Sequence, residues 1–248
     1  MKTICGIQAR MSSSRLPGKS LLPLNEETVI KRVYDNANKS GVFEKVLVLT
    51  STDKTDDELC HYLDDKKIEY LRGSLNNVFS RYIQILTLFE TDSVVRLTGD
   101  NPLIDSRVIR DVVTYHTDNA YDYTSNIINR KLPRGNDVEC IKRQTLESLK
   151  SITLTQEDLE HVTLFIRKNP KLYNLGSFEK DYNLKNKDIR LTLDYEEDYK
   201  FLLEIYNKLN LNKDFNDMYK IDKFITENPN FKNLNNNVSQ TEVNNKIW

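Results

Sequence analysis

The first half of the chain alternates between short apolar runs and stretches with helical periodicity. The runs at 3–7, 45–50 and 93–98 contain many β-branched residues and predict buried strands. Between them, apolar residues recur every three or four positions, which predicts helices. The elements expected there are helices at 29–37, 56–66, 78–89 and from 106 onward, and a short strand at 68–71. This alternation predicts a three-layer α/β fold, with a mostly parallel sheet and helices on both faces.

The pattern changes near residue 120, where the expected strands become shorter. They are predicted at 122–125, 137–141 and 189–193, with helices at about 143–151 and 156–168 and a last helix containing Phe201 and Ile205. Residues 233–246 are rich in Asn, which predicts a disordered or weakly held tail. We therefore expect a single domain over residues 1–232, followed by a tail at 233–248.

A basic loop follows the first predicted strand. It contains Arg10, Arg15 and Lys19, together with three consecutive serines at 12–14. Guanidinium and ammonium groups suit an extended chain of phosphates, and ligands of parallel α/β sheets bind at the carboxyl ends of strands. A Walker phosphate loop is excluded, because Ser13 stands where that motif has glycine and Pro23 discourages the helix that should follow. The alternative is a solvated basic turn.

Charge and cysteine content limit the partners and the compartment. Lys and Arg number 36 against 37 Asp and Glu, for a formal net charge of -1, so no overall field attracts nucleic acid or an anionic membrane. The apolar runs are too short to span a bilayer and the first residues do not resemble a secretion signal, so we expect a cytoplasmic protein. The three cysteines are far apart, which predicts free thiols.

Asp100 follows the third long predicted strand, directly after Gly99. In a parallel sheet this position lies at the same edge as the basic loop, so the two are expected to face one cleft. Asp194 follows the predicted strand at 189–193. Both carboxylates have a structural alternative as helix caps, Asp100 for the helix that begins near Ser106 and Asp194 in a box-like spacing with Glu197.

Several stretches carry a resemblance to one family. The segment from Gln8 to Lys19 resembles the N-terminal signature of the cytidylyltransferases that activate acidic sugars, such as CMP-KDO and CMP-sialate synthetases. The branch that it most resembles contains spore coat polysaccharide biosynthesis protein F. The stretches that agree with this branch in order and spacing, over about residues 3–200, are Thr50–Thr52, Arg72–Ser74 with Arg81-Tyr82, Arg96–Asp105 and Gly135–Glu139.

The resemblance implies a nucleotide-diphospho-sugar transferase (Rossmann-like) fold, with CTP and Mg²⁺ as ligands and often a homodimer. The nucleotide-binding residues that it implies are Gln8, Ala9, Arg10, Ser13, Arg15, Lys19, Arg72, Ser74, Asn77, Arg81 and Asp100. Among these, Arg10, Lys19 and Asp100 would be catalytic. Asp100 and Asp194 would hold Mg²⁺, which takes few protein carboxylates and completes its shell with phosphate oxygens and water.

The resemblance also implies an acceptor-binding and dimerisation subregion at about 120–190. The acceptor-binding residues expected are Asn126, Arg134, Asp137, Glu139 and Glu160, the last next to His161. Two positions depart from the related patterns. Asn136 stands where the family tends to have Leu, so the resemblance does not carry over the identity of the sugar. Thr192 stands where sialate enzymes often have a second acid, which leaves open the number of metal ions.

Structural alternatives exist for several of these side chains. Ser74 or Asn76 would serve as an ordinary helix N-cap, and Arg81 would be a surface side chain. Asp105 is expected to cap the helix that starts at Ser106. Arg96, inside a strand, is interpreted as structural and would need an acidic partner if buried.

The function predicted from these observations is transfer of CMP from CTP to a sugar acid or a sugar phosphate, with release of pyrophosphate. Such chemistry depends on positioning and on spreading the developing negative charge over cations. Two alternatives stay open: a glycosyltransferase that consumes a sugar nucleotide, whose usual Asp-x-Asp motif is missing behind the predicted strands, and a non-catalytic nucleotide-binding regulatory protein.

Overall fold

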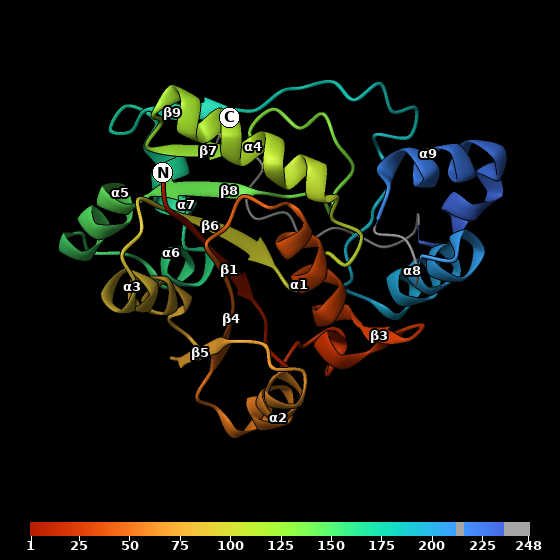
Figure 1. Cartoon of the computed structure of the whole chain (residues 1–248), viewed down its shortest axis with the longest axis horizontal. Coiled ribbons are helices and arrows are strands. Elements are labelled where there is room, and N and C mark those ends of the chain that lie inside the picture. Colours follow the sequence, from red (N-terminus) through yellow and green to blue (C-terminus); the bar gives the residue numbers. More distant parts are fainter. Residues whose placement is uncertain (212–215, 236–248) are drawn as a thin grey trace.

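A seven-stranded sheet forms the centre of the computed structural model, which describes residues 1–211 and 216–235. The strands lie in the order β5-β4-β1-β6-β8-β7-β9 (Figure 1). Their bounds are Thr3–Gln8 (β1), Lys45–Ser51 (β4), Tyr70–Gly73 (β5), Ser93–Thr98 (β6), Tyr123–Ser125 (β7), Glu139–Lys142 (β8) and Leu175–Ser177 (β9). A separate hairpin pairs Pro23–Leu24 (β2) with Glu27–Thr28 (β3).

Four neighbouring strands, β5, β4, β1 and β6, are parallel, and β8 runs antiparallel to both β6 and β7. The predicted mostly parallel α/β sheet is therefore confirmed. Gln8 pairs with Leu49 of β4 and with Thr98 of β6. The carboxyl ends of β1 and β6 consequently lie side by side, which brings the basic loop and Asp100 to one edge of the sheet.

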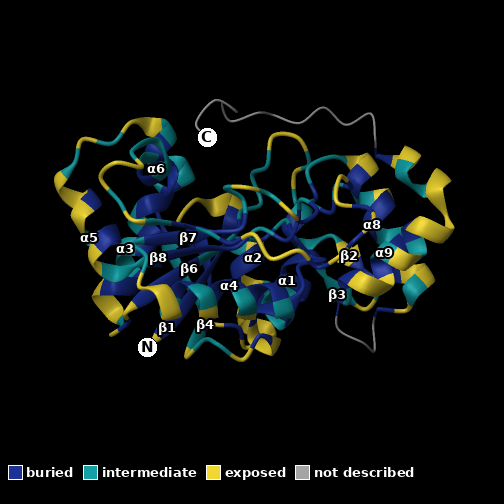
Figure 2. Cartoon of the chain, turned by 90° about the horizontal axis from the view of Figure 1, so that it is seen from above, coloured by how far each residue is buried: buried dark blue, intermediate teal, exposed yellow. Residues whose placement is uncertain are grey.

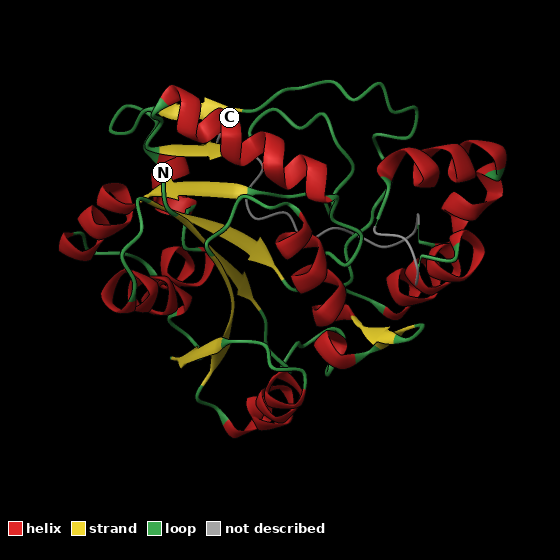
Figure 3. Cartoon of the chain, in the orientation of Figure 1, coloured by secondary structure: helices red, strands yellow, loops and turns green. Residues whose placement is uncertain are grey.

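Helices cover both faces of this sheet (Figure 3). The α-helices are Val29–Lys39 (α1), Asp57–Asp65 (α2), Val78–Leu88 (α3), Ser106–Asn119 (α4), Arg143–Ser148 (α5), Gln156–His161 (α6), Leu164–Lys168 (α7), Glu196–Leu209 (α8) and Met218–Glu227 (α9). Short 3₁₀ turns lie at Lys19–Leu21 (η1), Lys54–Asp56 (η2), Leu149–Ser151 (η3) and Pro229–Leu234 (η4).

The alternation of side chains along β1 explains the two layers of helices. Cys5 and Ile7 point into the cluster shared with α1, α2 and α4, whereas Ile4 points into the cluster shared with α3, α5 and α7. Each fully buried aliphatic side chain contributes about 1.5–3 kcal/mol. A third cluster joins α8 and α9 to Leu16 of the basic loop and to Leu24 of β2. This cluster and the two flanking the sheet form the buried interior in Figure 2.

Several predicted elements differ from the structure. The predicted strand at 189–193 is wrong: it is not a strand of the sheet, and its backbone meets its neighbours only at isolated points, such as the bridge between Arg134 and Arg190. The sheet ends instead with β9, which was not predicted. The predicted helix at 156–168 is two helices, because Val162 has a positive φ of 59°. The β2–β3 hairpin and α9 were also missed.

The predicted Asn-rich tail begins with residues that are held in place. The side chain of Asn235 is buried and donates to the carbonyl of Arg190 at 3.1 Å and to Asp198 at 3.2 Å. Asn235 is thus held by two hydrogen bonds, and residues 236–248 of the predicted tail lie outside the described residues, so the weakly held tail stays a prediction. The three cysteines are buried and free, as predicted. Within the described part of the chain, no helix is long and apolar enough to cross a membrane.

His116 is a buried polar link between α4 and the sheet. Its ring nitrogens lie 3.1 Å from the Ser93 hydroxyl and 2.9 Å from the Thr124 hydroxyl. Burial, reinforced by Lys142, lowers the pKa of His116 from its ordinary 6.5 to about 4. Between these values the unfolded chain binds more protons than the folded one, so the folded state loses stability as pH falls from 6.5 toward 4.

We expect His116→Gln to remove this pH-dependent loss. The lowered pKa corresponds to about 3 kcal/mol across that pH window, at ~1.4 kcal/mol per pKa unit. Urea unfolding of both proteins at pH 7 and pH 4.5 measures the difference. His61→Asn, on the exposed side of α2, is the control. If the free energy of unfolding falls equally between pH 7 and pH 4.5 in the variant and the parent protein, His116 is not the source of the pH dependence.

Candidate active site

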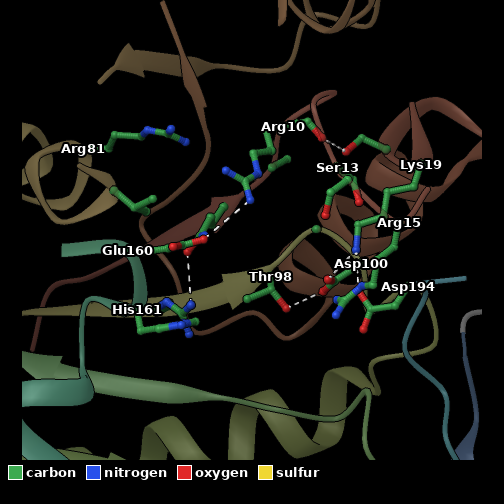
Figure 4. A pocket seen from close by; sticks show the side chains of 17 residues that line it. Arg10, Ser13, Arg15, Lys19, Arg81, Thr98, Asp100, Glu160, His161 and Asp194 are labelled. Carbon is green, nitrogen blue, oxygen red and sulfur yellow. Dashed lines mark hydrogen bonds and ion pairs between the residues drawn. The ribbon is translucent and has the colours of Figure 1, made fainter. Parts of the chain in front are cut away.

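A cleft of about 250 Å³ opens at the carboxyl ends of β1 and β6. The basic loop forms one side, the start of α3 and the end of α6 form another, and the segment around Asp194 closes the third (Figure 4). The lining residues are Gln8, Ala9, Arg10, Ser13, Ser14, Arg15, Lys19, Ser20, Val78, Arg81, Arg96, Thr98, Gly99, Asp100, Glu160, His161 and Asp194. The sequence prediction that Lys19 and Asp100 face one cleft is confirmed.

Backbone hydrogen bonds give the basic loop its shape. The carbonyl of Met11 accepts from the N–H groups of Ser13 and Gly18, each at 2.9 Å, which closes the loop on itself. Gly18 has a φ of 75°, in the left-handed region that side chains other than glycine rarely adopt. The chain then enters the single 3₁₀ turn η1 rather than a long helix, in agreement with the exclusion of a Walker loop.

Asp56 anchors this loop to the end of β4. Its fully buried carboxylate accepts from the Met11 N–H at 2.7 Å and from the Ser51 N–H at 3.0 Å, and also from the Ser51 hydroxyl. Because Ser51 ends β4, one side chain fixes the loop relative to the edge of the sheet. This carboxylate was not identified from the sequence, where it reads as an ordinary residue at the start of a helix.

Lys19 joins the two acidic residues at the floor of the cleft. Its Nζ donates to Asp100 Oδ2 at 2.8 Å, to Asp194 Oδ1 at 3.0 Å and to the carbonyl of Leu193 at 2.7 Å. Burial alone would lower the pKa of Lys19, but the two carboxylates raise it above its ordinary value. The ammonium therefore stays charged at neutral pH.

Each of the two carboxylates has a second partner. Thr98 donates its hydroxyl to Asp100 Oδ1 at 2.7 Å. Arg190 donates to Asp194 Oδ2 at 2.6 Å, and the Arg15 guanidinium lies 2.6 Å from Asp194 Oδ1. Burial would raise the pKa of Asp194, but Lys19 and the two guanidinium groups lower it to about 2.

Neither carboxylate caps a helix. Asp105 is the N-cap of α4, as predicted, and accepts from the Arg107 N–H at 2.8 Å. At the start of α8 the carboxylate of Asp198 accepts from the N–H groups of Asp194 and Tyr195, so the proposed box with Glu197 is wrong.

Glu160 and His161 enter the cleft from the end of α6. Glu160 lies 3.6 Å from the Arg10 guanidinium, which reaches across the cleft toward it (Figure 4). Immediately after them Val162 adopts φ 59° and ψ −55°, and the Thr163 N–H donates to the His161 carbonyl at 2.5 Å. This geometry is a γ-turn of the rare, strained type, which persists only where neighbouring contacts hold it.

A buried network beside the cleft supplies those contacts. Glu139 accepts from the Thr163 hydroxyl at 2.5 Å and the Tyr123 hydroxyl at 2.6 Å, and it pairs with Arg96. Burial would raise the pKa of Glu139, but Arg96 and Arg167 hold it below its ordinary value. The prediction that a buried Arg96 needs an acidic partner is confirmed, and Glu139 is that partner.

Arg81 is the most deeply buried guanidinium that lines the cleft. It is 1% exposed, and it donates to the carbonyls of Ser74, Leu75 and Leu49 at 2.8–3.3 Å. The interpretation as a surface side chain is therefore wrong. Burial lowers the pKa of Arg81, because its partners here are neutral carbonyls.

The profile of the cytidylyltransferase family matches residues 4–224 of the chain. The chain belongs to this family. Spore coat polysaccharide biosynthesis protein SpsF of Bacillus subtilis is 32% identical over 82% of this chain and 85% of its own length. The solved structure of a cytidylyltransferase from Leptospira borgpetersenii is 30% identical, covers 98% of this chain and all of its own, and superposes with a TM-score of 0.87.

A third comparison supports the fold. The structure of CMP-2-keto-3-deoxy-manno-octonic acid synthetase complexed with CTP has a TM-score of 0.65 at 16% identity and covers 84% of this chain and 99% of its own. The resemblance to acidic-sugar cytidylyltransferases and the nucleotide-diphospho-sugar transferase fold are thus confirmed.

The structure brings only part of the predicted site into the cleft. Predicted residues that line it are Gln8, Ala9, Arg10, Ser13, Arg15, Lys19, Arg81, Asp100, Glu160 and Asp194. Those outside its lining are Arg72, Ser74, Asn77, Asn126, Arg134, Asp137 and Glu139.

The residues outside the lining have local partners. Arg72 lies within β5 rather than after it, and it binds Asp57 at 2.7 Å. Asn77, not Ser74 or Asn76, caps α3. Asn126 is buried and accepts from the Val138 N–H, and Asp137 pairs with Arg130. Their predicted contacts with nucleotide or acceptor stay predictions.

Among the residues that line the cleft, Thr98, Arg96 and His161 were not predicted as functional. The position of Thr98, at the end of a strand and two residues before Asp100, could have identified it. His161 stood next to a predicted residue, but the direction of its side chain depends on the turn at Val162, which no sequence pattern predicts.

The donor set suits a magnesium ion. Asp100 Oδ2 and Asp194 Oδ1 lie within 3.0 Å of one Lys19 nitrogen, so two carboxylate oxygens converge on one point. No group of three or more His, Cys, Asp or Glu residues that could hold a metal exists within residues 1–211 and 216–235. Two carboxylates without a closed cage fit magnesium, which keeps positions for phosphate and water.

We expect Asp56→Ala to destabilise the protein by about 3 kcal/mol, because it leaves the buried N–H groups of Met11 and Ser51 without their acceptor. Amide exchange at residues 10–15 should accelerate more than elsewhere. Urea unfolding and hydrogen exchange measure both effects. The control is Asp53→Ala, whose carboxylate is exposed and caps only η2. Unchanged exchange in the loop would contradict the anchoring role.

Proposed function

We propose that the protein transfers CMP from CTP to a sugar acid or sugar phosphate and releases pyrophosphate, with Mg²⁺ as its metal. The observation that carries this proposal is the convergence of Lys19, Asp100 and Asp194 at the carboxyl edge of the sheet. Arg10 and Arg15 line the same cleft, so cations and carboxylates surround one space. The family membership supports the cytidylyl group as the transferred group.

The loop residues would bind and orient the triphosphate. Arg10 and Arg15 offer paired N–H donors to phosphate oxygens, and Lys19 adds a mobile point charge near the departing pyrophosphate. Asp100 and Asp194 would hold Mg²⁺, which neutralises developing charge on the phosphates. Such positioning accounts for most of the catalysis expected in phosphoryl transfer.

When the acceptor is a sugar acid, its attacking hydroxyl must also lose a proton, and we infer that His161 receives it. A sugar phosphate would attack through an oxygen that is already ionised. Asp100 and Asp194 are paired with cations, and Glu160 faces Arg10, which leaves the imidazole as the neutral base in the cleft lining. Burial, Arg96 and Arg167 lower the pKa of His161, and they outweigh Glu160 and Glu157, which raise it. A neutral imidazole at physiological pH is ready to accept a proton.

The acceptor would approach from the side of α6. We infer one domain over 1–232, with an acceptor-binding and dimerisation subregion at about 120–190 and a homodimeric cytoplasmic enzyme. SpsF is named for polysaccharide biosynthesis, and this similarity supports an acceptor destined for a surface glycan. Glu160 is the predicted acceptor residue that lies in the cleft.

The proposed function predicts Mg²⁺-dependent pyrophosphate release from CTP with one member of a panel of keto-sugar acids and sugar phosphates. Each of the four nucleoside triphosphates is tested with and without Mg²⁺. Asp100→Asn should lower the rate by at least about 100-fold, as expected for loss of a group that organises transition-state charge. The control is Asp188→Asn, an exposed carboxylate remote from the cleft.

Full turnover in the Asp100 variant would contradict the assigned role. CTP binding without pyrophosphate release for any acceptor of the panel would instead favour the alternative of a regulatory nucleotide-binding protein. Release of a nucleoside diphosphate from a sugar nucleotide would favour a glycosyltransferase.

For His161, the pH profile is the most informative measurement. The wild-type kcat should fall on acidification with a pKa below the ordinary histidine value, because the base becomes protonated. His161→Asn should remove this limb and lower kcat by about 100-fold or more, with the KM for CTP little changed. The control is His61→Asn. A retained acid limb in the His161 variant would exclude the proton-acceptor role.

A further inference from the structure

The Lys19 ammonium occupies the position that the proposed function assigns to a divalent cation. Its three N–H bonds are directed at Asp100 Oδ2, Asp194 Oδ1 and the Leu193 carbonyl, at 2.7–3.0 Å. An ammonium has three donors, so none is left for a phosphate while these contacts persist. The side chain is only 13% exposed, so water screens these ion pairs weakly.

The oxygens that Lys19 contacts are held by side chains of the basic loop, because Asp194 Oδ1 also pairs with Arg15 at 2.6 Å. On Asp100 the other oxygen, Oδ1, is held by Thr98, and on Asp194 the other oxygen, Oδ2, is held by Arg190. Each carboxylate therefore has one anchored oxygen that fixes its orientation. The remaining oxygens, Asp100 Oδ2 and Asp194 Oδ1, point at the same nitrogen and would keep that aim after Lys19 leaves.

The charge balance at this point opposes a metal ion in the free protein. Asp100 and Asp194 contact the cations Lys19, Arg15 and Arg190, and Arg190 also pairs with Asp198, so three cations already neutralise three carboxylates. A divalent cation would have to displace an ammonium and remain beside two guanidinium groups. A triphosphate reverses this balance, because it adds several negative charges and gives Lys19 and Arg15 new partners.

The size of the cleft agrees with such an exchange. Its volume of about 250 Å³ is below the roughly 300–1,000 Å³ of usual ligand sites. Lys19 and Arg15 belong to the loop that forms the wall of this cleft, so a nucleotide that enters it meets both side chains.

We propose that Lys19 is a built-in substitute for the metal ion, so that the nucleotide-free protein excludes divalent cations and binds metal only together with the triphosphate. The inference rests on the proposed function for the identity of the nucleotide. When the triphosphate enters, its oxygens take over the Lys19 and Arg15 donors. The freed oxygens of Asp100 and Asp194 then receive the metal. By linkage, metal and CTP strengthen each other's binding by the same factor.

The first test measures Mn²⁺ binding to the nucleotide-free protein by electron paramagnetic resonance or calorimetry. Wild type should bind weakly, and Lys19→Met should bind at least about tenfold more tightly, because it removes the competing charge. Lys19→Gln is a second variant in case the first is unstable. The matched control is Lys2→Met, which removes the same charge from an exposed pair with Glu90.

The second test measures CTP affinity of Asp100→Asn under two conditions. In EDTA this variant should bind CTP more tightly than wild type, by about threefold or more, since Lys19 loses one of its two carboxylate partners and a negative charge near the phosphates is gone. In Mg²⁺ it should bind more weakly than wild type. A merely structural role for Asp100 would weaken CTP binding under both conditions.

The two tests separate this inference from the proposed function. Unchanged Mn²⁺ affinity in both Lys19 variants, or weaker CTP binding by Asp100→Asn in EDTA, overturns the substitution of lysine for metal. If wild type binds no CTP under any condition, both the proposed function and the inferred coupling between CTP and metal fail. The Mn²⁺ result on the Lys19 variants then still decides whether lysine excludes the cation.

Discussion

One ammonium group between two carboxylates is the interaction on which the cleft depends. Lys19, Asp100 and Asp194 come from three distant segments, and the ion pairs at 2.8 and 3.0 Å draw the basic loop, the end of β6 and the segment before α8 to one point. Leu24, Leu191 and Phe201 belong to one hydrophobic cluster in the same region, and Leu16 packs against it, so this cluster supports the polar contact. Fold and chemistry therefore meet at the carboxyl edge of the sheet.

Two further buried acids set the walls of the cleft. Asp56 holds the backbone of the basic loop at Met11, and Glu139 holds Thr163 and Arg96 on the opposite side. Burying a carboxylate is costly unless charges or N–H donors surround it, so each of these acids fixes the groups that satisfy it. The strained turn at Val162 is maintained in this way, and the Lys19 ion pairs form the floor between these two walls.

The strands β1, β4 and β6 could be predicted because their side chains are buried on both faces and form continuous apolar runs. Their parallel order then placed Lys19 and Asp100 at one edge without any structural information. The segment 189–193 also has apolar residues at a spacing that suits a strand, but they are buried in the cluster with α8 rather than in the sheet, and the local sequence does not distinguish the two. Short β9 offers only three residues and no periodicity.

Part of the candidate site could also be predicted from the sequence. Arg10 and Asp100 were found because each lies just after the carboxyl end of a predicted strand. Arg72 and Asn126 followed only from the resemblance, and the structure gives them partners outside the cleft. The sequence marked His161 only as the neighbour of Glu160, since the direction of its side chain depends on the turn at Val162. Asp56 acts through tertiary contacts, so no local pattern reveals it.

The most direct measurement is a crystal structure with CTP and Mn²⁺, with the anomalous signal of manganese recorded. The account predicts the triphosphate along the loop from Arg10 to Lys19, with Lys19 Nζ on a phosphate oxygen and the manganese peak between Asp100 and Asp194. A nucleotide bound elsewhere, or a Lys19 that still bridges the two carboxylates beside bound CTP, would contradict it.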